Sequence, residues 1–428
     1  MLSALLNAFR VPDLRRKILF TLSIIALYRL GSYIPVPGVP IGALTDAFTD
    51  PSNPSLVMLN IFSGNALSNF SVFSLGIMPY ITASIIMQLM QGVIPSLQRM
   101  AREGESGQKR ITQITRYVCL GLGLINAVGY LFLFQSPTYG VVLTTEMPRI
   151  ITQLIIVITL VAGVGFIMWM GELITQRGVG NGMSLIIFAN IIAGFPSAIL
   201  QSAQTQSIWV TVLIITVVLA VIPGIVLIER AQRRIPINYA KRIQGRRMMG
   251  GQSTYIPLKV NGAGVIPIIF ASSLLFFPAQ LAVFFNVEWL TNFANVLSGG
   301  VGSPFPPANW ILNFALIVFF CFFYTSMVFN PQDTADNLRK QGGFIPGVRP
   351  GANTVQYIKN VLNRITLPGG FYIASIAVVP SIIFLFTNNA LITAFGGTSI
   401  LIMVGVALDT MSKIESQLKQ HHYEGFFK

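Results

Sequence analysis

The sequence has few charged side chains. Only 10% of its 428 residues are Asp, Glu, Lys or Arg, whereas about a quarter of an ordinary soluble domain is charged. Acids are scarcer than bases, with 14 against 28, and there are only two histidines and two cysteines. Because Cys119 and Cys321 stand alone in apolar runs, we expect neither a disulfide framework nor a cysteine metal site. These shortages argue against a soluble protein.

The motifs of common nucleotide and metal enzymes are missing as well. The sequence contains no Gly-x-x-x-x-Gly-Lys-[Ser/Thr] phosphate loop and no His-Glu-x-x-His motif. The adjacent His421 and His422 favour a solvated tail over a metal site. No paired carboxylates fall in the middle of the apolar runs, although ion-coupled transporters place ionisable groups there. We therefore expect no enzyme, no catalytic residues, no metal site and no cofactor.

Apolar residues make up 53% of the chain, and they gather in runs of about 20, the length of a helix that crosses a bilayer. We predict an all-α polytopic membrane protein with ten transmembrane helices. The predicted spans are Ile18–Ile34, Val72–Gln91, Gln113–Phe134, Ile150–Gly171, Met183–Gln201, Ile208–Ile228, Gly262–Phe285, Trp310–Phe329, Ile365–Phe386 and Thr398–Met411.

The cations alternate with these spans. All but two of the 28 lysines and arginines lie before the first span, after the last, or in or at the edge of every second loop, Arg116 being just inside the third span. Loops rich in Lys and Arg stay on the cytoplasmic side, so both termini are predicted to be cytoplasmic. The two exceptions are Arg149, at the start of the fourth span, and Arg29, inside the first. We expect Arg29 to snorkel or to pair with a backbone carbonyl.

Two short patterns recur in the two halves of the chain. Gly76–Ser84 and Gly264–Ser272 share the pattern Gly-x-x-Pro-x-Ile-x-Ala-Ser, and Gly182–Ile187 is echoed by Gly397–Ile402. A duplicated unit of five spans, an odd number, must insert the opposite way round the second time. We therefore predict two inverted five-helix halves. The predicted parts are an amphipathic cytoplasmic segment or an unstructured basic start at 1–17, an N-terminal half at 18–201, a C-terminal half at 202–412 and a cytoplasmic tail at 413–428.

Two features near the predicted centre leave alternatives open. Pro54–Phe70 is too short and polar to cross the bilayer, so it is either an external loop or a re-entrant piece buried in protein. Isoleucines in the repeated motifs form either a narrow apolar constriction between the halves or ordinary packing contacts. They are Ile81, Ile187, Ile269 and Ile402 at matching positions, together with Ile77, which shares a helix face with Ile81.

Two loops, 229–262 and 331–364, are strongly basic. The first contains two extended pieces, Arg234–Ile243 and Ser253–Val260, in which Pro236 and Pro257 exclude helix and favour edge strands. This cytoplasmic β-hairpin-like loop suits RNA phosphates or acidic protein surfaces, unless it is merely solvated. The second contains Gly342–Gly351, whose prolines and glycines predict a compact docking shape.

Several short motifs, in this order and spacing, resemble the SecY family of protein-conducting channels along essentially the whole chain. They are Phe62–Gly64, Gly76–Ile81, Gly178–Gly182, Arg233–Pro236, Tyr255–Lys259, Gly264–Pro267, Gly342–Gly351 and Gly396–Ser399. The resemblance implies a channel in the bacterial cytoplasmic (inner) membrane. Such a channel passes unfolded secretory proteins across the membrane and releases membrane-protein segments sideways through a lateral gate.

The resemblance also implies roles for particular residues. The five isoleucines become a pore ring, and a short plug helix at about 55–70 closes the outer funnel. The lateral gate lies between spans two and three on one side and spans seven and eight on the other. Pro79 and Pro267 are expected to act as hinges of the gate helices because proline removes a backbone hydrogen bond. The remaining assignments are Leu56, Leu59, Ile61, Phe62, Ser63 and Gly64 in the plug; Thr82, Gln88 and Asn261 at the gate; and Arg233, Arg234, Lys241, Arg242, Arg246, Arg247 and Arg349 at the docking surfaces.

The implied partners are the subunits SecE and SecG, the SecA ATPase, the ribosome with its nascent chain, signal peptides, translocating polypeptides and membrane lipids. The driving force comes from the bound ATPase or ribosome, because this chain has no nucleotide site of its own. The alternative is an inverted-repeat secondary transporter for a small solute. A transporter needs a coupling site at the middle of the membrane, which the sequence does not show.

Overall fold

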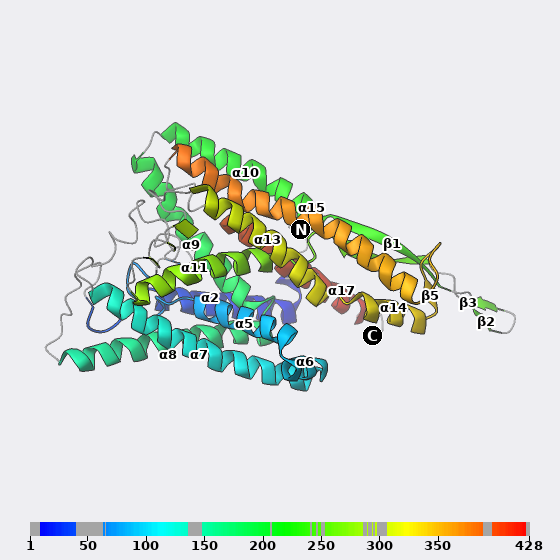
Figure 1. Ribbon diagram of the computed structural model, residues 1–428, viewed down its shortest axis with the longest axis horizontal. Helices are drawn as coiled ribbons and strands as arrows, with labels where there is room; N and C mark the ends of the chain where they lie inside the picture. Colours follow the sequence, from blue (N-terminus) through cyan, green and yellow to red (C-terminus); the bar gives the residue numbers. More distant parts are fainter. Residues whose placement is uncertain are drawn as a thin grey trace.

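The computed structural model is a bundle of long helices with small β-sheets at one end (Figure 1). It describes residues 9–39, 63–64, 66–135, 148–205, 208–239, 242–244, 247–249, 253–285, 289, 293, 296–297, 306–387 and 396–424. A helix overlaps each predicted span. In chain order these helices are α2 (Pro12–Gly31), α5 (Met78–Val93), α7 (Glu105–Gln135), α8 (Arg149–Arg177), α9 (Gly182–Thr205), α10 (Ile208–Arg230), α11 (Ile266–Phe285), α13 (Pro306–Val328), α15 (Ala352–Thr387) and α17 (Gly397–Glu424).

Not all of these helices are apolar and long enough to be identified as spans. Within the described residues, seven meet that standard, or up to eight if α5 and the short helix α6 (Pro95–Arg102) form one span bent by 99°. Helix α2 falls short because its 20 residues include four cations and Asp13. The mostly helical membrane fold is confirmed, and the number of ten crossings stays a prediction.

Several helices begin or end away from the ends of the predicted spans. The second span was expected from Val72, but helix α5 begins only at Met78, because residues 72–77 form turns that end in the left-handed Gly76. Helix α15 begins at Ala352 rather than Ile365, and α17 continues beyond Met411 to Glu424. In both cases polar residues extend a helix outside its apolar run, which a prediction based on apolar length cannot detect.

The first pair of sequence echoes has matching backbone conformations. Gly76 and Gly264 both have positive φ, 56° and 63°, a region that only glycine adopts readily. In each case the helix begins two residues later, at Met78 in α5 and at Ile266 in α11. The repeated motif therefore starts two helices in the same way.

The second pair of echoes makes matching backbone contacts. Gly182 and Gly397 open helices α9 and α17. A Cβ atom added at Gly182 would lie 1.9 Å from the carbonyl oxygen of Gly171 on α8, and one at Gly397 would lie 1.6 Å from that of Ile376 on α15. Each helix thus packs its first residue against the backbone of the helix before it in the chain.

A third correspondence was not visible in the sequence. A Cβ atom added at Gly163 on α8 would lie 2.0 Å from the carbonyl oxygen of Val72, and one at Gly369 on α15 would lie 2.4 Å from that of Val260. Val72 and Val260 each precede the left-handed glycine of the first echo by four residues. These three correspondences support the predicted duplication of the chain.

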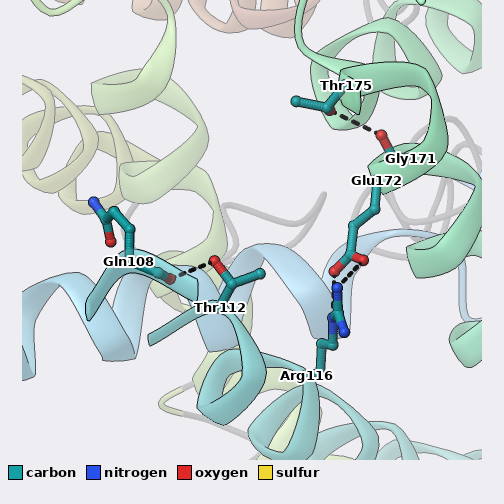
Figure 2. A network of polar contacts seen from close by, with 6 residues as sticks. All are labelled: Gln108, Thr112, Arg116, Gly171, Glu172 and Thr175. Carbon is teal, nitrogen blue, oxygen red and sulfur yellow. Dashed lines mark hydrogen bonds and ion pairs between the residues drawn. The ribbon is translucent and has the colours of Figure 1, made fainter. Parts of the chain in front are cut away.

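The halves meet along two lines of helices. Helix α11 contacts α5 and α7, and helix α17 contacts α2 and α9. The large hydrophobic core includes buried residues from both halves. Within the first half, α7 and α8 are joined by Arg116, whose Nε and Nη2 donate to the two carboxylate oxygens of Glu172 at 2.7 and 2.5 Å. Figure 2 shows these side chains pointing toward one another, with Thr112 and Thr175 each bonded to a carbonyl of its own helix.

The first basic loop forms the predicted hairpin. Strand β1 (Gln232–Tyr239) pairs antiparallel with β4 (Ser253–Lys259), and β2 (Arg242–Gln244) pairs with β3 (Arg247–Met249).

The second basic loop adds a strand that the sequence analysis did not predict. Strand β5 (Gly343–Phe344) pairs with β1, which makes β1 the central strand of the order β4-β1-β5. Pro236 was expected on an edge strand. It lies on the central strand, but it has a partner on one side only, because β5 pairs with no residue of β1 other than Asn238 and Tyr239. The loop also contains helix α14 (Pro331–Lys340).

The sheet and the second loop share a hydrophobic core of their own. Its buried members are Ile235, Leu258, Ile345, Ile358 and Leu362. They come from β1, β4, the turn after β5 and the first turns of α15, so the two basic loops and α15 form one packed unit. Figure 1 shows this unit, α6 and α14 at the same end of the bundle. The cation-rich loops therefore lie on one side, as the charge pattern predicted.

Candidate functional site

The five candidate ring isoleucines come from four helices and belong to one hydrophobic core. Ile77, Ile81, Ile187 and Ile402 are buried, and the half-buried Ile269 packs against the same cluster. Ile77 is the residue before α5, and its carbonyl accepts the backbone N–H of Ile81 one turn later. The structure thus places all five residues in the large hydrophobic core that both halves of the chain share.

A polar cavity of about 470 Å³ lies directly beside this cluster. Its lining includes Ser184 on α9, Ile266 on α11 and Gly405 on α17. Each of these residues is three positions, or about one helical turn, from a ring isoleucine: Ile187, Ile269 and Ile402, respectively. On three helices the lining of the cavity therefore lies within about one helical turn of a candidate ring isoleucine.

The lining of the cavity also carries charges of both signs. Lys259 at the end of β4, Arg230 on α10 and Lys413 on α17 line it, together with Glu229, Asp409 and Glu415. Since Lys259 belongs to the basic hairpin, the cavity lies at the base of that hairpin. The cavity could not be predicted from the sequence, because its lining comes from residues far apart in the chain.

Only part of the predicted plug lies in the described residues. Leu56, Leu59, Ile61 and Phe62 lie outside them. Ser63 and Gly64 are buried, and the described residues from 63 to 77 form turns, whereas the rest of the predicted plug helix lies outside the described residues. The Ser63 hydroxyl accepts the backbone N–H of Leu67 at 3.2 Å. This part of the chain is packed in protein, which favours the re-entrant alternative over an external loop.

Arg29 makes one of the two contacts that the sequence analysis expected for it. Its Nη1 donates to the carbonyl oxygen of Gly64 at 2.9 Å. The expected pairing with a backbone carbonyl is therefore confirmed, and the acceptor lies in the predicted plug.

The predicted gate residues on α5 mostly satisfy their hydrogen bonds within that helix. The Thr82 hydroxyl donates to the Met78 carbonyl at 3.0 Å, and Gln88 Nε2 donates to Ser84 Oγ at 3.2 Å. The Gln88 Oε1 atom is buried without a hydrogen-bond partner among the described residues. A buried acceptor of this kind costs free energy unless a donor reaches it.

Asn261 holds the base of the hairpin to the start of α11. It is 5% exposed, and its Nδ2 donates both to Glu229 Oε1 at 2.7 Å and to the Gly264 carbonyl at 3.0 Å. Glu229 lies in the last turn of α10, just before β1, and Asn261 follows β4. The pair therefore closes the hairpin where it joins two helices. The sequence did not predict this contact, because its two residues lie 32 positions apart.

The two hinge prolines do not act in the way that was predicted. Pro79 lies in the first turn of α5 and Pro267 is the second residue of α11. Backbone N–H groups in the first turn have no intrahelical acceptor, so neither proline removes a helix hydrogen bond. The physical reason given for the hinges is wrong, and their hinge role stays a prediction.

The docking cations are only partly described. Arg233 and Arg234 are exposed on β1, and the Arg234 guanidinium lies 4.8 Å from the centre of the Tyr255 ring on β4. Arg349 is exposed in the turn before α15, and its carbonyl accepts the Thr354 hydroxyl at 3.0 Å. Lys241 and Arg246 lie outside the described residues. Arg242 and Arg247 belong to the β2–β3 hairpin.

Comparisons with known proteins identify the family. The model of the SecY family matches residues 71–411. The chain is 48% identical to the protein translocase subunit SecY of Streptomyces coelicolor and 43% identical to that of Mycobacterium tuberculosis, each over the full length of both proteins. The chain therefore belongs to the SecY family.

Solved structures show the same fold at lower identity. A structure described as that of a protein conducting channel has a TM-score of 0.66 at 17% identity, and the match covers 94% of this chain and 91% of the other. Sec61 in a canine ribosome–channel complex has a TM-score of 0.59 at 16% identity, with the same coverage. The chain is a protein-conducting channel subunit of a translocase and a multi-pass protein of a bacterial membrane.

We expect Glu229 and Asn261 to act as a coupled pair. Glu229→Ala and Asn261→Ala should each lower thermal stability, and the double variant should lose less than the sum, with a coupling energy of about 1–3 kcal/mol. Thermal unfolding of the purified protein measures all three. As a control, Glu229→Ala combined with Thr82→Ala should be additive, because Thr82 bonds to its own helix. Additivity in both pairs contradicts the contact.

Proposed function

We propose that an unfolded polypeptide enters the polar cavity from the cytoplasmic end and passes through the ring of Ile77, Ile81, Ile187, Ile269 and Ile402. The observation that carries this proposal is the position of the cavity, whose lining lies one helical turn from the ring on three helices. A polar entrance accepts the peptide groups of any sequence. The apolar ring then offers a passing chain no hydrogen bonds, so it does not retain it.

The ring also serves as the seal of the resting channel. Branched apolar side chains from four helices pack closely, and an apolar constriction excludes water and ions. The segment containing Ser63 and Gly64 acts as the plug on the outer side of the ring and is displaced when a chain passes. Its burial in the protein supports this role.

The lateral gate is the line along which α11 meets α5 and α7. A sufficiently apolar segment leaves the channel between these helices and enters the lipid. Thr82, Gln88 and Asn261 are polar groups of this gate, and Pro79 and Pro267 mark its hinges. The buried Gln88 Oε1 atom without a partner lowers the cost of opening, because opening lets water reach it.

The basic unit docks the partners that supply the driving force. It carries Arg233, Arg234 and Arg349 on one packed structure, and Lys241, Arg242, Arg246 and Arg247 belong to the same loops. These cations suit the acidic surfaces of the SecA ATPase and the phosphates of the ribosome. The ribosome-bound Sec61 structure, which shares this fold, supports the ribosome as a partner.

The proposal also covers the membrane, the orientation of the chain and its partner subunits. The basic end faces the cytoplasm, both termini lie on that side, and the membrane is the bacterial cytoplasmic (inner) membrane. SecE and SecG complete the channel, and signal peptides reach it at the gate. The halves 18–201 and 202–412 enclose the pore between them. The family match disfavours a transporter of small solutes.

A stalled secretory chain should crosslink to the ring. We expect a photoreactive amino acid at position 81 to crosslink to a stalled translocating polypeptide in membrane vesicles. The same probe at position 158, where the side chain of Ile158 on α8 is exposed, should give no crosslink. A stalled chain that never reaches position 81 contradicts the conduit, and a small-solute transporter predicts that outcome.

A polar residue in the ring should weaken the seal. Ile81→Asn or Ile402→Asn replaces a buried branched side chain, so precursors with defective signals should be exported about tenfold faster. Pulse-labelling of such precursors in cells measures this rate. Ile158→Asn is the control and should leave it unchanged. Equal rates in all three variants and the unaltered protein would show that these isoleucines are ordinary packing residues.

Reversing one docking charge should impair motor-driven export. Arg349→Glu should lower SecA-dependent export in vesicles about tenfold, equivalent to ~1.4 kcal/mol of binding, while the amount of assembled protein stays normal. Arg339→Glu, an exposed arginine on the neighbouring α14, is the matched control. The docking role of Arg349 is wrong if both variants export at the normal rate.

A further inference from the structure

Arg29 is a cation inside a predicted membrane span, where ionisable side chains are costly and commonly functional. Its Nη1 atom donates to the Gly64 carbonyl at 2.9 Å, and its guanidinium carbon lies 5.7 Å from the centre of the Tyr33 ring. None of the ion pairs among the described residues includes Arg29. Its contacts are therefore with neutral groups: a peptide carbonyl and an aromatic face.

The acceptor residue is suited to this contact in two ways. Gly64 has a positive φ of 68°, which an L-residue adopts only at a cost. A Cβ atom added there would lie 2.5 Å from Arg29 Nη1 and 2.6 Å from Asn190 Oδ1. Only glycine lets the backbone of this segment come so close to the two polar side chains.

The surroundings of Gly64 also include α9, the helix that carries the candidate ring residue Ile187. Asn190 is fully buried on α9, and its Nδ2 donates to the hydroxyl of Tyr28 at 2.9 Å. Tyr28 is the neighbour of Arg29 on α2, and Asn190 lies about one turn beyond Ile187. Arg29 and Asn190 thus hold Gly64 between α2 and α9, next to the isoleucine cluster.

We propose that Arg29 is a positioning residue that latches the segment around Gly64 in its closed position. The proposal rests on the plug role assigned above. A single hydrogen bond from a cation to a carbonyl suits a latch that must reopen. A buried carboxylate partner would form a stronger pair, and breaking that pair would leave two charges uncompensated in the bundle.

The test measures how often the segment leaves its packed position. Leu67, which is 1% exposed in the same segment, is replaced by Cys in the full-length protein, and Cys119 and Cys321 are replaced by Ala. The rate of modification by a membrane-impermeant maleimide is then compared in cells with Arg29 and with Arg29→Leu. We expect the rate to rise roughly tenfold to a hundredfold, the range for a lost hydrogen bond to a charged group.

Further variants test whether the effect comes from the contact between Arg29 and Gly64. Arg29→Lys, which keeps the charge but has a shorter reach, should raise the rate less than Arg29→Leu. Gly64→Ala should raise it as Arg29→Leu does, because the added methyl displaces the guanidinium. Tyr33→Leu tests the aromatic contact and should have a smaller effect. A cysteine in place of the buried Ile156 on α8 reports on general loosening and should stay unreactive in every variant.

Two outcomes overturn the latch. One is an unchanged modification rate at position 67 in both Arg29→Leu and Gly64→Ala. The other is an equal rise at position 156, which would make Arg29 a general structural residue. Export of precursors with defective signals is measured separately in the same variants. If position 67 becomes reactive while this export stays low, the latch stands and the plug role of the segment is wrong.

Discussion

The fold depends on helices that touch through their backbones. A glycine on α8 contacts the carbonyl oxygen of Val72, and a glycine on α15 contacts that of Val260. Gly182 and Gly397, the first residues of α9 and α17, contact carbonyl oxygens of the same two helices. Small residues permit such close approach in membranes, where helices gain no hydrophobic driving force from lipid. These contacts fix where α5, α9, α11 and α17 begin. All five candidate ring isoleucines lie within a few residues of those starting points, so the backbone contacts also position the ring.

Much of the fold could be predicted because the membrane restricts the chain to helices and the cations indicate sides. Helix ends were predicted less well, since Ala352 and Glu424 lie in polar sequence that folds on other protein surfaces. Strand β5 could not be predicted, because two residues, Gly343 and Phe344, carry no strand pattern without their partner β1. The contacts of Gly163 with Val72 and of Gly369 with Val260 could not be predicted either, because the two residues of each pair lie far apart in the sequence.

The candidate site was predictable only in part, for a related reason. The resemblance to the SecY family supplied the five ring positions, which stay a prediction, and four of them, Ile81, Ile187, Ile269 and Ile402, also occupy matching places in the repeated motifs. The acceptor for Arg29 was expected to be a carbonyl, but nothing local identified Gly64, which lies 35 residues away. The partners of Glu229 and Glu172 were not predicted either, because Asn261 and Arg116 come from distant segments. Polar contacts between segments depend on packing, which sequence patterns do not encode.

Helix α15 has a mechanical consequence. Its 36 residues give a length of about 54 Å, whereas the hydrocarbon core of a bilayer is about 30 Å thick. The part outside the lipid carries Ile358 and Leu362, which anchor the basic sheet, and its first turn is bonded to the loop of Arg349. Under the docking role proposed above, a load at this loop would reach the second half of the bundle through α15. Pro368 and Pro380 lie inside this helix, and each removes a backbone hydrogen bond, so we expect the helix to bend at these two positions under load.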